Sequence, residues 1–93
     1  MLEEDIKQYN GLVEDFNNLD SSDYASAYVL SQLALTLADR WNEIMLDSTK
    51  YSRDFSKTKS EFTNYCYQKV KILMKIHDMC RCVWRKGVYE IGD

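Results

Sequence analysis

The residue types that most often bind metals occur together at one place in the chain, as His77-x-x-Cys80-x-Cys82. A structural zinc site needs four such ligands arranged as a tetrahedron. On a helix, His77 and Cys80 share a face, whereas Cys82 lies about 200° around the axis from Cys80. Cys66 would lie about three turns away from His77. The spacing therefore predicts no metal site, and we expect Cys66 and Cys80 to be small hydrophobic residues of a core.

His77 is the only histidine, and no residue pattern typical of an enzyme accompanies it. A catalytic histidine needs a nucleophile or an acid placed beside it. Asp78 is adjacent in sequence and so points to a different side of a helix. The carboxylate pair Glu14/Asp15 is expected on an exposed helix face, and the chain has no glycine-rich phosphate loop. We therefore expect a non-enzymatic protein without a cofactor, with His77 at the edge of the core.

The elements that position these residues are predicted to be helices. The chain has 93 residues, 45% hydrophobic and 29% charged, which is typical of one folded domain spanning residues 1–93. It contains no proline and no glycine between Gly11 and Gly87, so the main local breakers of regular structure are missing. Apolar residues recur every three or four positions, and no segment alternates with period two. The sequence predicts an all-α fold.

Hydrophobic spacing predicts three helices, over about residues 2–18, 22–47 and 51–86. The first helix has apolar residues alternately four and three positions apart, at Leu2, Ile6, Tyr9, Val13 and Phe16. A run of Asn, Asp and Ser then ends it, because these side chains compete for backbone hydrogen bonds. Ser21 or Ser22 is the expected N-cap of the second helix.

The junction between the second and third helices allows two interpretations. Low helix propensity over residues 47–60 favours a tight turn near Ser48 and Thr49, which gives an antiparallel three-helix bundle or a long helical hairpin. Alternatively, the spacing of three and four residues continues through this segment, and one unbroken helix would be roughly 95 Å long. We expect the turn, because helices of that length are uncommon. Gly87 is the expected C-cap of the last helix, followed by an irregular tail.

The second helix is apolar over almost its whole circumference between residues 27 and 38. Two neighbouring helices in so small a chain can hardly cover it, so this helix is either central or part of a subunit interface. We therefore expect the chain to form homo-oligomers through its second and third helices. The residues expected to form the interaction surface are Val29, Leu33, Leu35, Trp41 and Trp84. The expected core comprises Ile6, Tyr9, Val13, Leu30, Leu37, Trp41, Ile44, Phe62, Val70, Leu73, Ile76 and Cys80.

Charge is distributed unevenly along the chain. Residues 1–48 carry a net charge of −8, and residues 49–93 carry +5. On a continuous third helix, basic residues lie roughly along one side, at Lys50, Arg53, Lys57, Lys71, Lys75 and Arg85, and tyrosines are interleaved with them. This combination is used by proteins that bind single-stranded nucleic acid through phosphate contacts and base stacking. We expect instead that the basic side pairs with the acidic first half, with Glu14, Asp15, Asp39 and Glu43 as the first candidate partners.

The remaining features predict a cytoplasmic protein with reduced thiols. The N-terminal residues resemble no signal peptide, the cysteines are odd in number, and the longest apolar stretch is too short and polar to span a membrane. A short, motif-free helical chain of this kind is typical of accessory proteins of viruses and phages. The sequence therefore predicts a helical interaction or assembly module that binds itself and another protein. The alternative is an accessory protein that binds single-stranded DNA or RNA.

Overall fold

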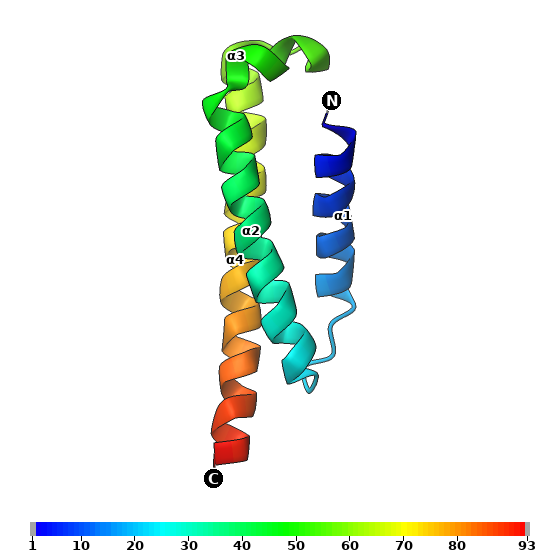
Figure 1. Cartoon of the computed structure of the whole chain (residues 1–93), viewed down its shortest axis with the longest axis vertical. Helices are drawn as coiled ribbons and strands as arrows, with labels where there is room; N and C mark the ends of the chain where they lie inside the picture. The colour runs from blue at the N-terminus through cyan, green and yellow to red at the C-terminus, as the bar shows by residue number, and fades with distance from the viewer. Residues whose placement is uncertain (1, 93) are drawn as a thin grey trace.

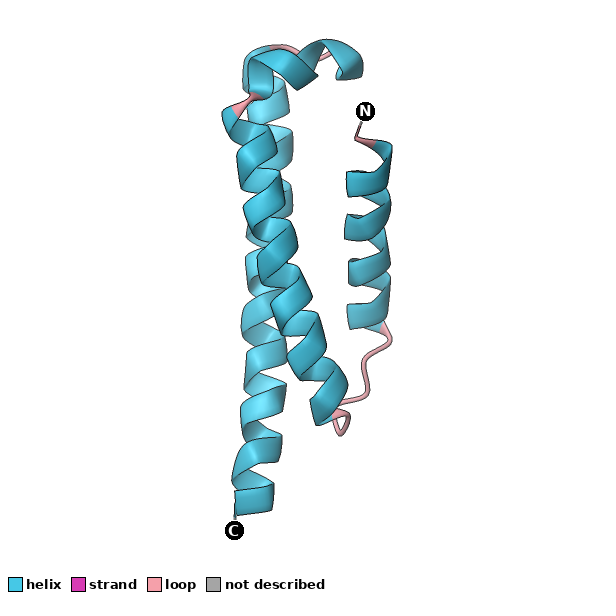
Figure 2. Ribbon diagram, in the orientation of Figure 1, coloured by secondary structure: helices cyan, strands magenta, loops and turns pink. Residues whose placement is uncertain are grey.

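The computed structural model describes residues 2–92, with the side chains of all of these except residues 54 and 90–92. Its elements are α1 (Glu3–Asn17), α2 (Tyr24–Leu46), α3 (Ser48–Tyr51), the 3-10 helix η1 (Ser52–Phe55) and α4 (Lys59–Gly92). Every regular element in this range is helical, which confirms the all-α class. The long helices α2 and α4 form an antiparallel hairpin, and the shorter α1 lies alongside it (Figures 1 and 2). The result is a rod measuring 54 × 18 × 14 Å.

The link between α1 and α2 is fixed by two aspartates. The carboxylate of Asp20 accepts hydrogen bonds from the backbone N–H and the hydroxyl of Ser22, at 2.9 and 2.7 Å. Asp23 then caps α2, because its carboxylate accepts a hydrogen bond from the backbone N–H of Ser26 at 3.1 Å. The expected N-cap at Ser21 or Ser22 was therefore wrong. Ser22 instead serves as the donor that orients Asp20.

The chain reverses direction at a corner made of α3, η1 and a left-handed residue, Ser56, with φ 50° and ψ 38°. The chain does reverse direction here, but it does so through two short helices and not through the expected tight turn near Ser48 and Thr49. The alternative of one unbroken long helix was wrong. α4 begins at Lys59 and not near residue 51, after Thr58 accepts a hydrogen bond from the backbone N–H of Glu61 at 3.1 Å. The apolar spacing continues through the corner because its aromatic residues cover the end of the core.

Gly87 does not end the last helix. α4 continues through it to Gly92, so the C-cap and the irregular tail expected from the sequence were both wrong. Gly87 is buried against the side chain of Tyr24, at the start of α2, where a Cβ atom would overlap the tyrosine. The glycine thus allows the two helices to approach closely. The last turns of α4 extend past the start of α2 (Figure 1).

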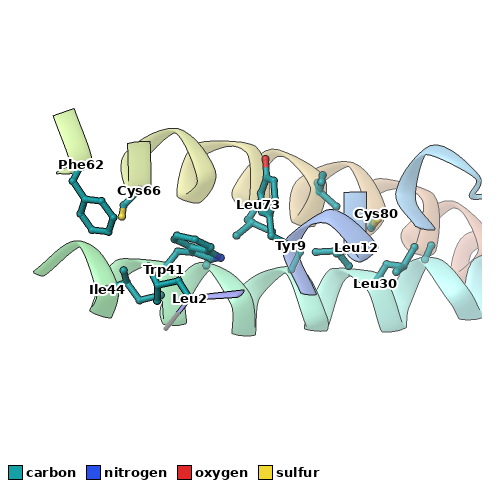
Figure 3. Packing of buried hydrophobic residues seen from close by; sticks show 14 residues of the cluster. Leu2, Tyr9, Leu12, Leu30, Trp41, Ile44, Phe62, Cys66, Leu73 and Cys80 are labelled. Atoms are coloured by element: carbon teal, nitrogen blue, oxygen red, sulfur yellow. The ribbon is translucent and has the colours of Figure 1, made fainter. Parts of the chain in front are cut away.

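The core lies between α2 and α4 and is covered on one side by α1 (Figure 3). Trp41 is fully buried at its centre, with edge-to-face contacts to Tyr9 and Tyr65 at ring-centre distances of 6.4 and 6.0 Å. Its indole Nε1 has no hydrogen-bond partner among the described residues, so Trp41 stabilises the fold through packing and ring contacts. Phe62 of α4 stacks with Tyr51 of the corner and makes a tilted ring contact with Phe55, which closes this end of the core.

Eight of the twelve expected core residues are buried, whereas four lie at its edge. The edge residues are Ile6, Val13, Leu37 and Val70. Five further buried residues were not in the expected core, namely Leu2, Leu12, Ala27, Ala34 and Ala38. The alanines and the buried Ser31 recur every three or four residues along α2, so a seam of small side chains faces the core there. Small residues let the α4 side chains pack close to the α2 backbone, which hydrophobicity alone does not indicate.

Candidate interaction site

Two apolar side chains on the outer part of α2 remain exposed beside α1. Val29 is 54% exposed and Leu33 is 48% exposed. They are four residues apart, so they lie next to each other on one side of the helix. Val29 lines a hollow of about 500 Å³ between α1 and α2, and Leu33 lines both this hollow and a second one of about 410 Å³. The two hollows adjoin at Leu33 and Asp15. We call these two hollows together the α1–α2 groove.

The α1–α2 groove has an apolar floor and an acidic rim. Its apolar lining includes Leu12, Leu19, Val29, Leu30, Leu33 and Leu37. The rim carries the carboxylates of Asp15, Asp20 and Asp23. Hydrogen bonds from Ser22 lower the pKa of Asp20, and hydrogen bonds from Ser26 lower that of Asp23. These two rim carboxylates are therefore ionised at neutral pH.

The other residues expected on the interaction surface lie elsewhere. Leu35 is on the opposite side of α2, in a separate hollow of about 440 Å³ that His77, Arg81 and Arg85 also line. Trp41 is fully buried within the chain, so its assignment to the surface was wrong. Trp84 is partly buried against Tyr28 of α2, at a ring-centre distance of 5.3 Å. Of the five expected residues, only Val29 and Leu33 lie together.

The six expected basic residues do not form one continuous row, because the chain reverses between α2 and α4. Lys50 and Arg53 lie in α3 and η1, and Lys57 lies in the loop that precedes α4. Lys71 and Lys75 lie on the side of α4 that faces away from its buried residues, whereas Arg85 lines the hollow beside Leu35 of α2, and all three are exposed. Tyr67 and Met74 are exposed on the same side as the two lysines, at 52% and 37%. We call Tyr67, Lys71, Met74 and Lys75 the basic face of α4.

Lys69 also belongs to α4 but not to its basic face. Its ammonium nitrogen lies 4.0 Å from the ring centre of Tyr9, 4.6 Å from that of Tyr65 and 5.4 Å from that of Trp41. Burial lowers the pKa of Lys69. The negative faces of the three rings oppose that effect by stabilising the cation. Lys69 is therefore used inside the chain and is not free to bind an external anion.

The expected ion pairing between the two halves of the chain was wrong. Between residues whose side chains the structure describes, the ion pairs join Arg40 to Asp5 at 3.0 Å and Arg40 to Glu43 at 3.8 Å, all within the first half. Asp15, one of the expected partners, lines the α1–α2 groove, and the side chains of Lys71 and Lys75 are exposed to solvent. The basic face of α4 lies opposite the core, so it points away from the acidic helices. Its charge is consequently not neutralised within the chain.

His77 and two of the three cysteines contribute to the packing of the chain. Nδ1 of His77 donates a hydrogen bond to the backbone carbonyl of Ser31 at 2.9 Å and thereby joins α4 to α2. Cys66 and Cys80 are buried, and burial raises the pKa of Cys66 to about 11. Cys82 is exposed. Among the side chains that the structure describes, no group of three or more His, Cys, Asp or Glu residues is placed to hold a metal ion.

The sequence did not indicate the acidic rim of the groove or the place of Met74 on the basic face. Tyr67 was expected among the tyrosines interleaved with the basic residues. One signal could have found Met74: it lies seven residues after Tyr67, with Lys71 between them on the same side of a helix. The groove itself had no such signal, because it depends on where α1 packs.

Comparison with known proteins gives no relative from which a function could be transferred. No protein-family model matches the chain, and it has no significant match among curated proteins or solved structures. Among the helices of the described part, none combines the length and the hydropathy needed to cross a membrane. The site is therefore interpreted from its own geometry.

Proposed function

We propose that this protein is a non-enzymatic assembly module that binds other copies of itself, and through the same surface a partner protein, by way of the α1–α2 groove. The observation that carries this proposal is the pair Val29 and Leu33, which are adjacent, apolar and about half exposed over an apolar floor. Exposed apolar surface bordered by polar residues is typical of protein-binding sites. Covering it would remove these side chains from water.

Light scattering after size-exclusion chromatography tests the proposal. We expect the average mass of the wild type to rise with concentration, and Leu33→Lys to lower it while circular dichroism shows unchanged helicity. Leu35→Lys is the matched control, because Leu35 is exposed on the other side of α2. A wild type that stays monomeric at high concentration would overturn self-assembly. If Leu35→Lys loses association and Leu33→Lys does not, the interface lies on the side of α2 that carries Leu35, and the α1–α2 groove is not the binding site.

A second candidate function is binding of single-stranded nucleic acid by the basic face of α4. It is supported by the exposure of Lys71 and Lys75, which form no ion pair with another described side chain. Tyr67 lies on the same face and offers a ring on which a base could stack. Lys50, Arg53 and Lys57 at the corner would form a separate basic area.

Fluorescence anisotropy with a labelled oligothymidylate tests this second function. Binding should weaken steeply with added salt, because each neutralised phosphate releases counterions. Lys71→Glu combined with Lys75→Glu should abolish binding, whereas Lys50→Glu combined with Lys59→Glu, the same change of charge elsewhere, should reduce it only partly. Absence of binding by the wild type at low salt would exclude this function.

A further inference from the structure

The structure contains two surfaces of opposite charge that cannot meet within one chain. The α1–α2 groove has an apolar floor and three rim carboxylates. The basic face of α4 has two apolar side chains, Tyr67 and Met74, beside two ammonium groups, those of Lys71 and Lys75. Because the basic face lies opposite the core, it points away from α1 and α2 of its own chain. Neither set of charges is paired with an opposite charge among the described side chains.

The basic face of α4 has the pattern of a helix that binds in a groove. Tyr67, Lys71 and Met74 are placed at positions i, i+4 and i+7, so they form one ridge along the helix. Lys75 lies one turn after Lys71, so its ammonium group widens the positively charged side of that ridge. Asp78 ends the positively charged face, which limits the complementary segment to residues 67–75. This segment offers apolar anchors for the floor of the groove and ammonium groups for its rim.

We propose that residues 67–75 of α4 in one copy bind in the α1–α2 groove of the next copy, so that the copies associate head to tail. The inference rests on the self-assembly proposed above and specifies the partner surface. Tyr67 and Met74 contact the groove floor near Val29 and Leu33. Lys71 and Lys75 lie beside the rim carboxylates of Asp15, Asp20 and Asp23. Since the two surfaces differ, two bound copies still have one free groove and one free basic face between them, and growth into rings or filaments follows.

Head-to-tail association predicts a result that a symmetric dimer does not give. One variant, Leu33→Lys, has a defective groove and an intact basic face. The other, Lys71→Glu with Lys75→Glu, has an intact groove and a defective basic face. Each should be monomeric alone in sedimentation velocity, with association weakened roughly tenfold or more. An equimolar mixture should form heterodimers, in which the basic face of the Leu33→Lys chain binds in the groove of the other variant. These heterodimers should not grow, because their remaining groove and their remaining basic face are both defective.

Salt and matched variants separate this proposal from simple apolar association. Wild-type association should weaken as salt is added, because the charges at the rim are solvent-exposed and screened. Lys50→Glu with Lys59→Glu, the same change of charge away from the basic face, should associate like the wild type. Adding Asp15→Lys and Asp20→Lys to the Lys71→Glu, Lys75→Glu chain should restore self-association, since charge complementarity returns with the opposite sign.

The outcomes distinguish the failure of this inference from failure of the proposed function. If the wild type associates and the Lys71→Glu, Lys75→Glu variant associates equally well, self-assembly stands and the head-to-tail contact is wrong. A mixture of the two defective variants that remains monomeric also overturns the head-to-tail contact. If the wild type is monomeric at high concentration and low salt, both proposals fail. Circular dichroism on each variant checks that a lost association is not a lost fold.

Discussion

The ammonium nitrogen of Lys69 in α4 lies 4.0 Å from the centre of the Tyr9 ring in α1, which makes Lys69 a cationic link between these helices. α1 has two buried apolar contacts near this point, Tyr9 itself and Leu12. The link therefore accounts for part of the attachment of α1 to the hairpin. It also engages the charge of one of the ten basic residues of the second half within the chain.

A double-mutant cycle measures this link. Tyr9→Leu keeps an apolar side chain but loses the ring, and Lys69→Met keeps an unbranched side chain but loses the charge. We expect a coupling free energy of about 1 kcal/mol between the two changes in urea unfolding, because the cation is partly removed from water. Strictly additive losses would mean that the contact between cation and ring does not stabilise the fold.

Gly11 and Gly87, which both lie inside helices, should respond in opposite ways to the same substitution. Gly87→Ala should destabilise the fold by about 1–3 kcal/mol, because its Cβ overlaps the Tyr24 ring in a packed interface. Gly11→Ala should stabilise it by up to about 1 kcal/mol, because no atom outside the helix lies within 4 Å of the new Cβ and alanine favours helix. Thermal and urea unfolding measure both. Equal stabilisation by the two substitutions would contradict the close packing of α4 against Tyr24.

The ion pair between Asp5 and Arg40 should contribute measurably to the attachment of α1 to α2. The guanidinium donates two hydrogen bonds to the carboxylate, at 3.0 and 3.3 Å, and the Asp5 side chain is largely buried. We expect Asp5→Asn to lower the free energy of unfolding by about 1 kcal/mol, near the upper end for partly exposed pairs. Glu43→Gln is the matched control and should have almost no effect, because its contact with Arg40 is 3.8 Å and exposed.

The three thiols should differ in reactivity. Cys82 is exposed, whereas Cys66 and Cys80 are buried and burial raises the pKa of both. Since the thiolate is the reactive form, a disulfide reagent should modify Cys82 rapidly in the native protein. It should modify Cys66 and Cys80 only as the protein unfolds. The Cys82→Ser variant should lose the rapid phase. Three equally fast thiols would contradict the buried positions of Cys66 and Cys80.

Alkaline pH should destabilise the fold through Cys66. Its pKa is about 11 in the folded chain against 9.0 for an exposed thiol, so the folded state retains a proton that the unfolded state loses. The stabilisation is complete below pH 9 and is lost as the pH rises toward 11, by up to about 2 kcal/mol. Cys66→Ala should show a shallower fall in unfolding free energy over this range. An identical fall in both proteins would assign the effect to other groups.

The sequence alone determined the helical class and the approximate positions of the long helices. Local propensity, the missing breakers and the spacing of apolar residues are properties of short segments, so they can be read without knowing what packs where. The burial of Trp41, Phe62 and Leu73 followed from the same spacing. These residues are large and apolar, and each lies on the predominantly apolar side of its own helix.

Tertiary packing decided the features that the sequence predicted wrongly. Gly87 lies inside a helix and not at its end. A glycine is needed there because Tyr24, 63 residues away in the chain, occupies the space of a Cβ. The corner over residues 47–58 breaks one basic row into two areas and turns the basic face of α4 away from the acidic helices. The α1–α2 groove exists only because α1 packs where it does. Contacts between residues far apart in the chain carry no local signal, so only the folded structure could reveal them.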